Sequence, residues 1–254
     1  MLPAERREKI LKYVQESGKV VVEELAKCLS VSTMTIRRDL QILDGQGLVI
    51  RTHGGAIVNN ASLIDEVSYQ EKVVTHIDTK RRIAGKASEL VQEGYTIILD
   101  AGTTNMELAK LLISKKDVRV ITNDILIAAY LYPYSNIEVF CCGGMVQNKT
   151  GAIVGGAAKE FFTGIFADIV FLGASAFNLK HGVTTPNYEK AQLKQQMLSA
   201  ANQKVLMCDS SKYGKESFAR VCQLQDLDLI ITDFNFEQES LNSLSAKSVT
   251  IKAV

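Results

Sequence analysis

The residues Asp100, Gly102, Thr103 and Thr104 form a polar turn between an apolar run and a helical pattern, in the stretch TIILDAGTTNMELAKLL at residues 96–112. Gly102 allows the chain to turn closely, and the two hydroxyl groups and the first amides of the helix can bind a phosphate. The turn lacks GxGxxG and GxxxxGK spacings, so neither a dinucleotide site nor an ATP-binding P-loop is indicated. Taken alone, it fits a capped strand-to-helix connection better than a binding site.

Other polar stretches follow apolar runs in the same way. They are TND at 122–124, GG at 143–144, GASAFN at 173–178 and DSSK at 209–212. In a parallel sheet these stretches would all lie at the carboxyl ends of the strands, where ligands of such sheets bind. Lys212 can add a positive charge to a phosphate or pair with a carboxylate, although an exposed lysine without a role is the alternative.

A second group of residues has a pattern suited to DNA. In SVSTMTIRRDLQILDGQGL, Ser32 is a good N-cap, and Ile36, Leu40 and Leu43 form one apolar stripe at helical spacing. That stripe leaves Arg37 and Arg38 on other faces of the helix. The alternative is a solvated helix face on which Asp39 pairs with one of these arginines.

The elements around this helix favour the DNA interpretation. Residues 5–17 have an amphipathic helical pattern, a β-branched run begins at Val20, a short helix follows, and after the long helix come a strand at 48–51 and the glycine tip THGGA. This order is typical of a winged helix-turn-helix. Its recognition helix enters the major groove with its first turn near base edges, and Arg51 and His53 suit a wing that meets the DNA backbone or minor groove.

The remainder of the chain alternates helix and strand patterns. Helices are predicted at 79–92, 104–113, 124–131, 157–164 and 187–201, and strands at 96–100, 118–122, 137–142, 168–172, 204–209, 229–232 and 249–254. Apolar strands separated by helices indicate an α/β fold with a mainly parallel, Rossmann-like sheet covered on both faces. The predicted domains are residues 1–56, which bind DNA, a linker at 57–76, and residues 77–254, which bind an effector.

Composition argues against a membrane protein, an exported protein and a zinc protein. The chain has 254 residues, 46% of them hydrophobic and 22% charged, with a formal net charge of +1. No apolar run approaches the ~20 residues of a membrane helix, and the first residues do not form a signal-peptide core, so we expect a cytoplasmic protein. Five cysteines without a CxxC pair and only three histidines argue against a disulfide framework or a zinc site. We expect no metal and no cofactor.

The first domain resembles the DNA-binding domain of the DeoR family of bacterial transcription regulators. The resemblance lies in VSTMTIRRDL at 31–40, QGL at 46–48 and RTHGGA at 51–56. In that family these positions form a recognition helix and a wing. The resemblance therefore assigns DNA contacts to Ser32, Thr33, Thr35, Arg37, Arg38, Arg51 and His53.

The resemblance continues over nearly the whole chain. The segments LDAGTTN, ITND, CCGGMV, GAIVGG, FLGASAFN, GVTTPNYEKA and CDSSKYGK are similar to the sensor domain of DeoR-type regulators. That domain is similar in fold to ribose-5-phosphate isomerases and CoA transferases and generally senses phosphorylated sugars or related metabolites. The effector positions implied by the resemblance are Asp100, Gly102, Thr103, Thr104, Asn123, Gly144, Thr184, Glu189, Asp209 and Lys212.

An enzyme of the isomerase type is the alternative function. Such isomerases carry two aspartates in a D-G-A-D stretch, and sugar-phosphate isomerisation needs a base to move a proton. Here the matching residues run from Leu172 to Ser175 and contain no carboxylate. Glu189 alone is poorly equipped for catalysis, and nothing suggests the CoA-binding segment that a transferase with a glutamate nucleophile requires.

The sequence thus predicts a non-enzymatic DNA-binding regulator, a repressor of a carbohydrate-metabolism operon that a phosphorylated sugar releases from its operator. Paired half-sites are read by symmetric oligomers, so a homodimer or homotetramer is expected. The identity of the sugar, the operator sequence, repression as opposed to activation, the subunit number and the route of transmission are left open.

Overall fold

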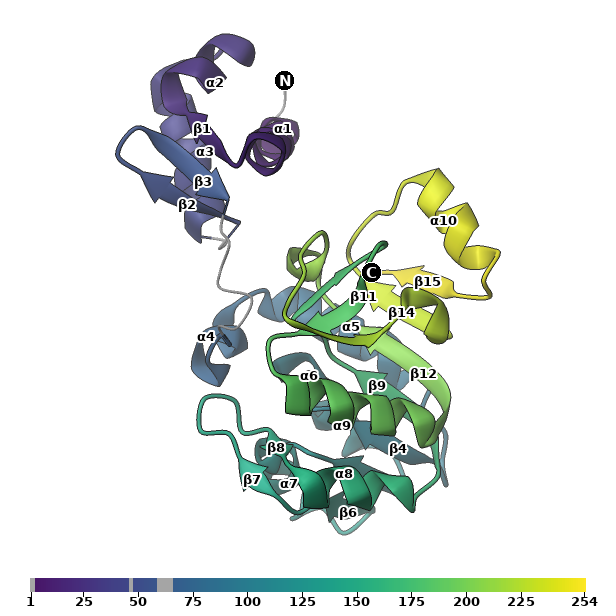
Figure 1. The fold of residues 1–254 in the computed structure, drawn as a ribbon. Coiled ribbons are helices and arrows are strands. Elements are labelled where there is room, and N and C mark those ends of the chain that lie inside the picture. Colours follow the sequence, from purple (N-terminus) through teal and green to yellow (C-terminus); the bar gives the residue numbers. More distant parts are fainter. Residues whose placement is uncertain (1–2, 46–47, 59–65) are drawn as a thin grey trace. The chain divides into compact units, whose positions relative to one another are not determined.

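The computed structural model describes residues 3–45, 48–58 and 66–254 and divides into two compact units, Met1–Ser62 and Leu63–Val254 (Figure 1). Each unit has its own hydrophobic core.

The first unit has the winged helix-turn-helix fold that the sequence predicts. Its elements are α1 (Pro3–Ser17), β1 (Lys19–Val21), α2 (Val22–Cys28), α3 (Thr33–Gly45), β2 (Val49–Thr52) and β3 (Gly55–Val58). The strands form an antiparallel sheet in the order β1-β3-β2. The stripe of Ile36, Leu40 and Leu43 is buried against Ile10 and Val14 of α1, so the spacing of apolar residues did identify the inner face of α3.

The hairpin of β2 and β3 is the wing, and a glycine allows it to close on β1. A Cβ atom at Gly55 would lie 1.8 Å from the carbonyl oxygen of Val20. The adjacent backbone makes use of this approach, because the amide of Val22 donates a 2.9 Å hydrogen bond to the carbonyl of Gly54. Position 55 therefore has no room for a side chain in this sheet, and glycine is the residue that fits there.

The second unit is built on a seven-stranded parallel sheet with the order β15-β14-β12-β9-β4-β5-β6. Its strands are β4 (Thr96–Leu99), β5 (Val118–Thr122), β6 (Ile137–Cys141), β9 (Ala167–Leu172), β12 (Ala201–Met207), β14 (Leu229–Thr232) and β15 (Thr250–Ala253). Each of the seven predicted strands is one of these strands. The α/β fold class is confirmed.

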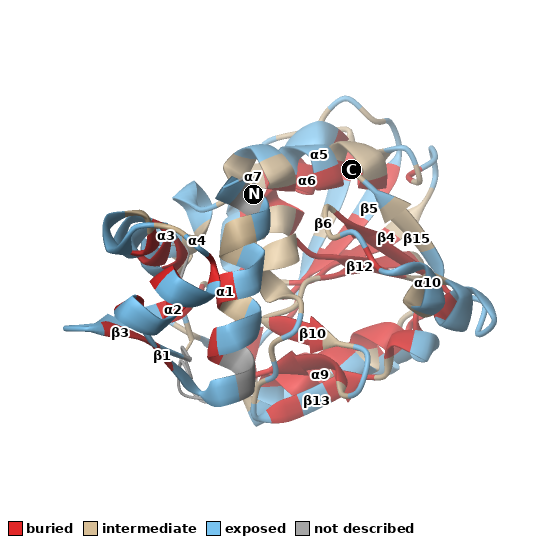
Figure 2. Cartoon of the chain, turned by 90° about the horizontal axis from the view of Figure 1, so that it is seen from above, coloured by how far each residue is buried: buried red, intermediate tan, exposed pale blue. Residues whose placement is uncertain are grey.

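Helices cover both faces of this sheet, because successive side chains of each strand point to opposite faces. On one face Ile97 and Leu99 pack against α5 (Ile77–Ser88), α6 (Thr103–Leu112) and α7 (Ile125–Leu131). On the other face Ile98 packs with α8 (Gly156–Thr163) and α9 (Tyr188–Ser199). Figure 2 shows β4 and β12 in the colour of buried residues.

Several elements of the second unit were not predicted from the sequence. They are α4 (Tyr69–Val74), the hairpin of β7 (Met145–Val146) and β8 (Ile153–Val154), β10 (Ala176–Asn178), β11 (Gly182–Thr185), β13 (Ala219–Cys222), α10 (Gln238–Ser245) and the short 3-10 turns η1 (Ser210–Lys212) and η2 (Leu224–Asp226). β10, β11 and β13 form a small antiparallel sheet of their own.

The linker predicted at residues 57–76 is only partly without regular structure. Residues 57 and 58 belong to β3, and residues 69–74 form α4. The amide of Tyr69 donates a 2.7 Å hydrogen bond to the carbonyl of Lys149, which attaches α4 to the second unit. Residues 59–65 lie outside the described residues.

Candidate DNA interface and candidate effector site

The start of α3 is fixed by the residues that the sequence assigns to DNA contact. Ser32 caps the helix, since the amide of Thr35 donates to the Ser32 hydroxyl oxygen at 3.1 Å, and the two hydroxyl oxygens lie 2.9 Å apart. Ser32 and Thr33 are exposed, and Thr35 is half-buried. Small hydroxyl side chains therefore surround the N-terminal end of the predicted recognition helix.

The arginines of α3 are exposed, and the neighbouring aspartate is paired elsewhere. Asp39 is buried and accepts a 2.5 Å hydrogen bond from Arg6 of α1. The alternative pairing of Asp39 with Arg37 or Arg38 is therefore wrong. Arg37 lies 4.0 Å from Glu23 across the surface, and Arg38 is exposed without an ion-pair partner among the described residues.

The wing carries its polar residues on the outside. The amide of Arg51 donates to the carboxylate of Asp44 at 3.0 Å, while the Arg51 side chain is exposed. His53 is exposed in the turn between β2 and β3. A phosphate backbone in contact with this hairpin would meet both side chains.

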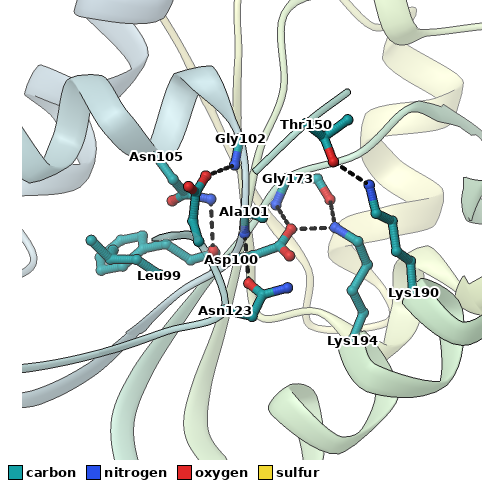
Figure 3. Close-up of polar contacts among 12 residues, drawn as sticks. Leu99, Asp100, Ala101, Gly102, Asn105, Asn123, Thr150, Gly173, Lys190 and Lys194 are labelled. Carbon is teal, nitrogen blue, oxygen red and sulfur yellow. Dashed lines mark hydrogen bonds and ion pairs between the residues drawn. The ribbon is translucent and has the colours of Figure 1, made fainter. Parts of the chain in front are cut away.

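In the second unit, polar residues that follow β4 and β5 bond to one another. The amide of Ala101 donates to Asn123 Oδ1 at 2.8 Å, and the amide of Gly102 donates to Asp124 Oδ2 at 3.1 Å (Figure 3). The DAGTT turn is thus held by side chains from the next strand. The first amides of α6 beyond Gly102 have no partner within the helix, as at any helix N-terminus.

Asp100 joins three elements of the unit. Its Oδ2 accepts from the amide of Gly173, after β9, at 2.9 Å and from Lys194 of α9 (Figure 3). The Lys194 ammonium also donates to the carbonyl of Gly173 at 2.9 Å. Asp100 Oδ1 is buried and has no hydrogen-bond donor among the described residues. This oxygen is therefore a free acceptor at the carboxyl end of the sheet.

Asp124 is the second buried carboxylate here. Burial raises its pKa to about 6, although hydrogen bonds from the amides of Leu126, Ile127 and Gly102 favour the charged form. The side chain thus caps α7 and fixes the DAGTT turn at the same time.

Lysines gather beside these carboxylates. The Lys190 ammonium lies 2.5 Å from Glu66 Oε1 and 3.2 Å from the hydroxyl oxygen of Thr150. Lys72 of α4 lies 3.7 Å from the same Glu66 oxygen. Lys80 of α5 donates to the carbonyl of Lys72.

These lysines bind their protons less tightly than a lysine in water does. Burial lowers the pKa of Lys72 to about 8, and the nearby charges of Lys190, Lys212 and Lys194 lower it further against the opposing effect of Glu66. Burial also lowers the pKa values of Lys80 and Lys190. A site in which lysines lose protons readily is one that a further anion would stabilise.

Five of the predicted effector residues lie in or beside the DAGTT turn. Asp100 and Gly102 belong to the turn, and Asn123 accepts a hydrogen bond from its Ala101 amide. Thr103 and Thr104 begin α6. Lys212 is near enough to Lys72 and Lys80 for its positive charge to contribute to lowering the pKa of each. Asp209 is buried and caps η1 through the amide of Ser211 at 3.1 Å.

Three other predicted effector residues are not joined to this cluster by any contact among the described residues. A Cβ atom at Gly144 would lie 2.4 Å from the carbonyl oxygen of Val154, so this glycine permits a close backbone approach. Thr184 is buried, and its hydroxyl oxygen accepts from the amide of Ser217 at 2.9 Å. Glu189 is exposed in the first turn of α9.

The sequence interpretation missed the lysines. Lys190 and Lys194 are four residues apart in α9 and therefore share one helical face. That spacing was visible in NYEKAQLK, but lysines at helical spacing usually mark a solvated surface. Only the packing of α9 against the sheet shows that both point inward.

The described part of the chain contains no metal-binding cluster, no helix that could span a membrane and no disulfide. No group of three His, Cys, Asp or Glu side chains that could hold a metal ion lies among residues 3–45, 48–58 and 66–254. None of the described helices is long and apolar enough to cross a membrane. The five cysteines are free thiols.

Comparisons with known families agree with this architecture. Residues 6–62 match the DeoR-like helix-turn-helix domain, and residues 75–234 match the DeoR C-terminal sensor domain. The HTH-type transcriptional regulator GlpR of Haloferax volcanii is 38% identical over 99% of this chain and 98% of its own length. The putative aga operon transcriptional repressor of Escherichia coli O157:H7 is 33% identical over 98% of this chain and 93% of its own length.

A third relative and one solved structure complete the comparison. The lactose phosphotransferase system repressor of Staphylococcus epidermidis is 35% identical over 91% of this chain and 92% of its own length. The solved ribose 5-phosphate isomerase A of Methanocaldococcus jannaschii aligns with 55% of each chain at 18% identity and a TM-score of 0.41. With both domain models matched and full-length relatives above 30% identity, the chain belongs to the DeoR family of transcriptional regulators.

Proposed function

We propose that this regulator represses genes of carbohydrate metabolism by binding operator DNA as a homodimer or homotetramer, and that a phosphorylated sugar bound by its second unit releases it. The relatives named as repressors of the aga operon and of a lactose phosphotransferase system support the link to sugar genes. DNA as the partner implies that the protein acts in the cytoplasm.

The DNA contacts come from α3 and the wing. The buried pair of Asp39 and Arg6 leaves Arg37 and Arg38 exposed on the helix that begins at Ser32. Exposed arginines near the start of a recognition helix can bond to base edges or phosphates, and small hydroxyl groups can bond to phosphates. The residues proposed to contact DNA are Ser32, Thr33, Thr35, Arg37, Arg38, Arg51 and His53.

The effector binds at the carboxyl ends of the parallel strands. The observation that carries this proposal is the group of buried lysines beside the free Asp100 oxygen. Lysines can bind a phosphate, and a carboxylate oxygen can accept hydrogen bonds from sugar hydroxyls. The proposed positions remain Asp100, Gly102, Thr103, Thr104, Asn123, Gly144, Thr184, Glu189, Asp209 and Lys212.

We further propose that the second unit does not convert its ligand. Leu172, where isomerases of this fold carry an aspartate, is fully buried in the core, and Ser175 stands where the second aspartate would be. Glu189 is exposed on the surface of α9. Incubating the protein with pentose phosphates tests this point directly, since turnover would contradict it.

Binding and release are tested with the full-length chain. The protein first selects duplexes from a random DNA library, and a panel of sugar phosphates is then titrated into the complex with the selected duplex. We expect one sugar phosphate to release the DNA and to raise the melting temperature of the protein, because the ligand binds the DNA-incompetent arrangement more tightly. Failure to select any duplex, or release by none of the panel, would count against the proposal.

A further inference from the structure

The contact between Glu66 and Lys190 links the strap, defined here as residues 66–75, to the candidate effector site. The strap contains α4. None of the residues of α4 is fully buried, and Val74 is exposed. Among the described residues, the hydrogen bonds and ion pairs of the strap to the second unit are made by the carboxylate of Glu66, the amide of Tyr69 and the carbonyl of Lys72, and Tyr69 is half-buried. An element with so little apolar burial has low local stability.

The Glu66 carboxylate lies among donors that suit a larger anion. Its Oε1 atom is 2.5 Å from the Lys190 ammonium and 3.7 Å from the Lys72 ammonium. The buried hydroxyl of Thr150, in the turn between β7 and β8, is 3.2 Å from the same Lys190 nitrogen. Two ammonium groups and one hydroxyl can donate to the several oxygens of a phosphate, whereas one carboxylate oxygen now serves both lysines.

The charge balance points the same way. Glu66 has a single negative charge, and Lys72 and Lys190 are both near Lys194, while Lys72 is also near Lys212. Asp100 is already paired with Lys194, and the charges of Asp209 and Glu107 act on Lys80. Lys72 and Lys190 share the single charge of Glu66, so a phosphate monoester with a charge near −2 would neutralise these two lysines better than Glu66 does.

We propose that Lys72, Lys190 and Thr150 form the subsite for the phosphate group of the effector, and that the Glu66 carboxylate is its internal occupant. The inference rests on the proposed function. The incoming phosphate takes the place of Glu66 and breaks the main charged attachment of the strap. Because the strap follows the segment that leads from the DNA-binding unit, this exchange couples ligand binding to the connection between the units.

The proposal is tested by removing the competing charge. Glu66→Gln keeps the size of the side chain but not its charge, and Glu93→Gln is a matched control because Glu93 is exposed in the second unit. Binding of inorganic phosphate to the full chain is measured by calorimetry. We expect Glu66→Gln to bind phosphate roughly tenfold more tightly than the unmodified protein. The phosphate then no longer has to displace a charged carboxylate from Lys72 and Lys190. Glu93→Gln should bind within about twofold of it.

Three further measurements test the subsite and guard against a folding defect. Lys190→Gln should bind inorganic phosphate at least about tenfold more weakly, because it removes a charge-assisted hydrogen bond. Glu66→Gln leaves Lys190 buried without its carboxylate, so its melting temperature should rise more with added phosphate than that of the unmodified protein. Hydrogen exchange at the amides of α4 should become faster on phosphate binding, and it should be fast in Glu66→Gln before any is added.

The outcomes separate this inference from the proposed function. If the unmodified protein binds phosphate but Glu66→Gln binds it no better, the internal occupant does not exist and only this inference fails. If neither inorganic phosphate nor any sugar phosphate binds the protein, both fail. Comparing ribose 5-phosphate with ribose and with inorganic phosphate then shows how much of the affinity comes from the phosphate group.

Discussion

Arg38 is the residue whose role at the DNA interface can be isolated most cleanly. It is exposed on α3 and has no ion-pair partner among the described residues, so its removal breaks no described ion pair. We expect Arg38→Ala to weaken binding to the selected duplex by about tenfold or more, because one base or phosphate contact is lost. A mobility-shift titration measures this change.

A control distinguishes a specific contact from a general loss of charge. Lys9 of α1 is also exposed, and Lys9→Ala removes the same charge from the same unit. Lys9→Ala should bind DNA nearly as the unmodified protein does. If Arg38 contacts a phosphate, its removal should also reduce the log–log slope of affinity against salt by about 1. Equal effects of the two variants would contradict an interface centred on α3.

Lys72 gives the effector site a predictable pH dependence. Burial first, and then the charges of Lys190, Lys212 and Lys194, lower its pKa to about 8, while Glu66 opposes the shift. Phosphate binds the charged lysine, so its affinity should fall by up to about tenfold per pH unit as the pH rises above about 8. Calorimetry of inorganic phosphate binding between pH 7 and 9.5 measures this fall in affinity. In Lys72→Gln the affinity should depend less on pH.

The lowered pKa of Lys72 makes folding stability rise with pH, whereas phosphate affinity falls with pH. The folded-state pKa of Lys72, about 8, lies below the ordinary lysine value of 10.5, so between these pH values the unfolded chain holds the proton more tightly. The charged lysine therefore costs folding free energy below about pH 8, and that cost is relieved as the pH rises. Ligand binding and folding thus oppose each other at this residue, as expected of a binding site.

At the scale of elements, the wing depends on one close backbone approach. A Cβ atom at Gly55 would lie 1.8 Å from the Val20 carbonyl oxygen, whereas one at Gly54 meets nothing within 4 Å. We expect Gly55→Ala to destabilise the first unit by about 1–3 kcal/mol through this overlap, and Gly54→Ala to have little effect. Hydrogen exchange of the α3 amides in the full chain reports on the first unit alone. Equal protection in the two variants would show that β1 and β3 can separate at no cost.

The elements that the sequence predicted well are those whose burial has a regular period. The seven strands of the parallel sheet are continuous apolar runs, and the inner face of α3 is a stripe at helical spacing. The antiparallel sheet of β10, β11 and β13 was missed because its strands are only three or four residues long and because β11 pairs with β13 across a long separation in the chain. Asp39 and Lys190 were misjudged or missed because their partners, Arg6 and Glu66, are distant in sequence.

At the scale of the whole molecule, regulation requires a difference in effector affinity between two arrangements of the chain. An effector that binds both arrangements equally shifts nothing, however tightly it binds. The coupling is also reciprocal, so DNA must weaken effector binding by the factor by which the effector weakens DNA binding. Each of the two sites lies within a unit that has its own core, so each can be altered without changing the contacts of the other.

Lys212→Ala tests this separation in the intact protein. Lys212 is half-buried in η1 and adds positive charge near Lys72 and Lys80, so its removal should weaken phosphate binding by about tenfold without touching α3 or the wing. We expect the variant to bind the selected duplex with unchanged affinity and to need about ten times more sugar phosphate for release. Lys116→Ala, which removes an exposed lysine of the same unit, should behave as the unmodified protein. If Lys212→Ala weakens DNA binding as much as it weakens the response, the two activities do not reside in separable units.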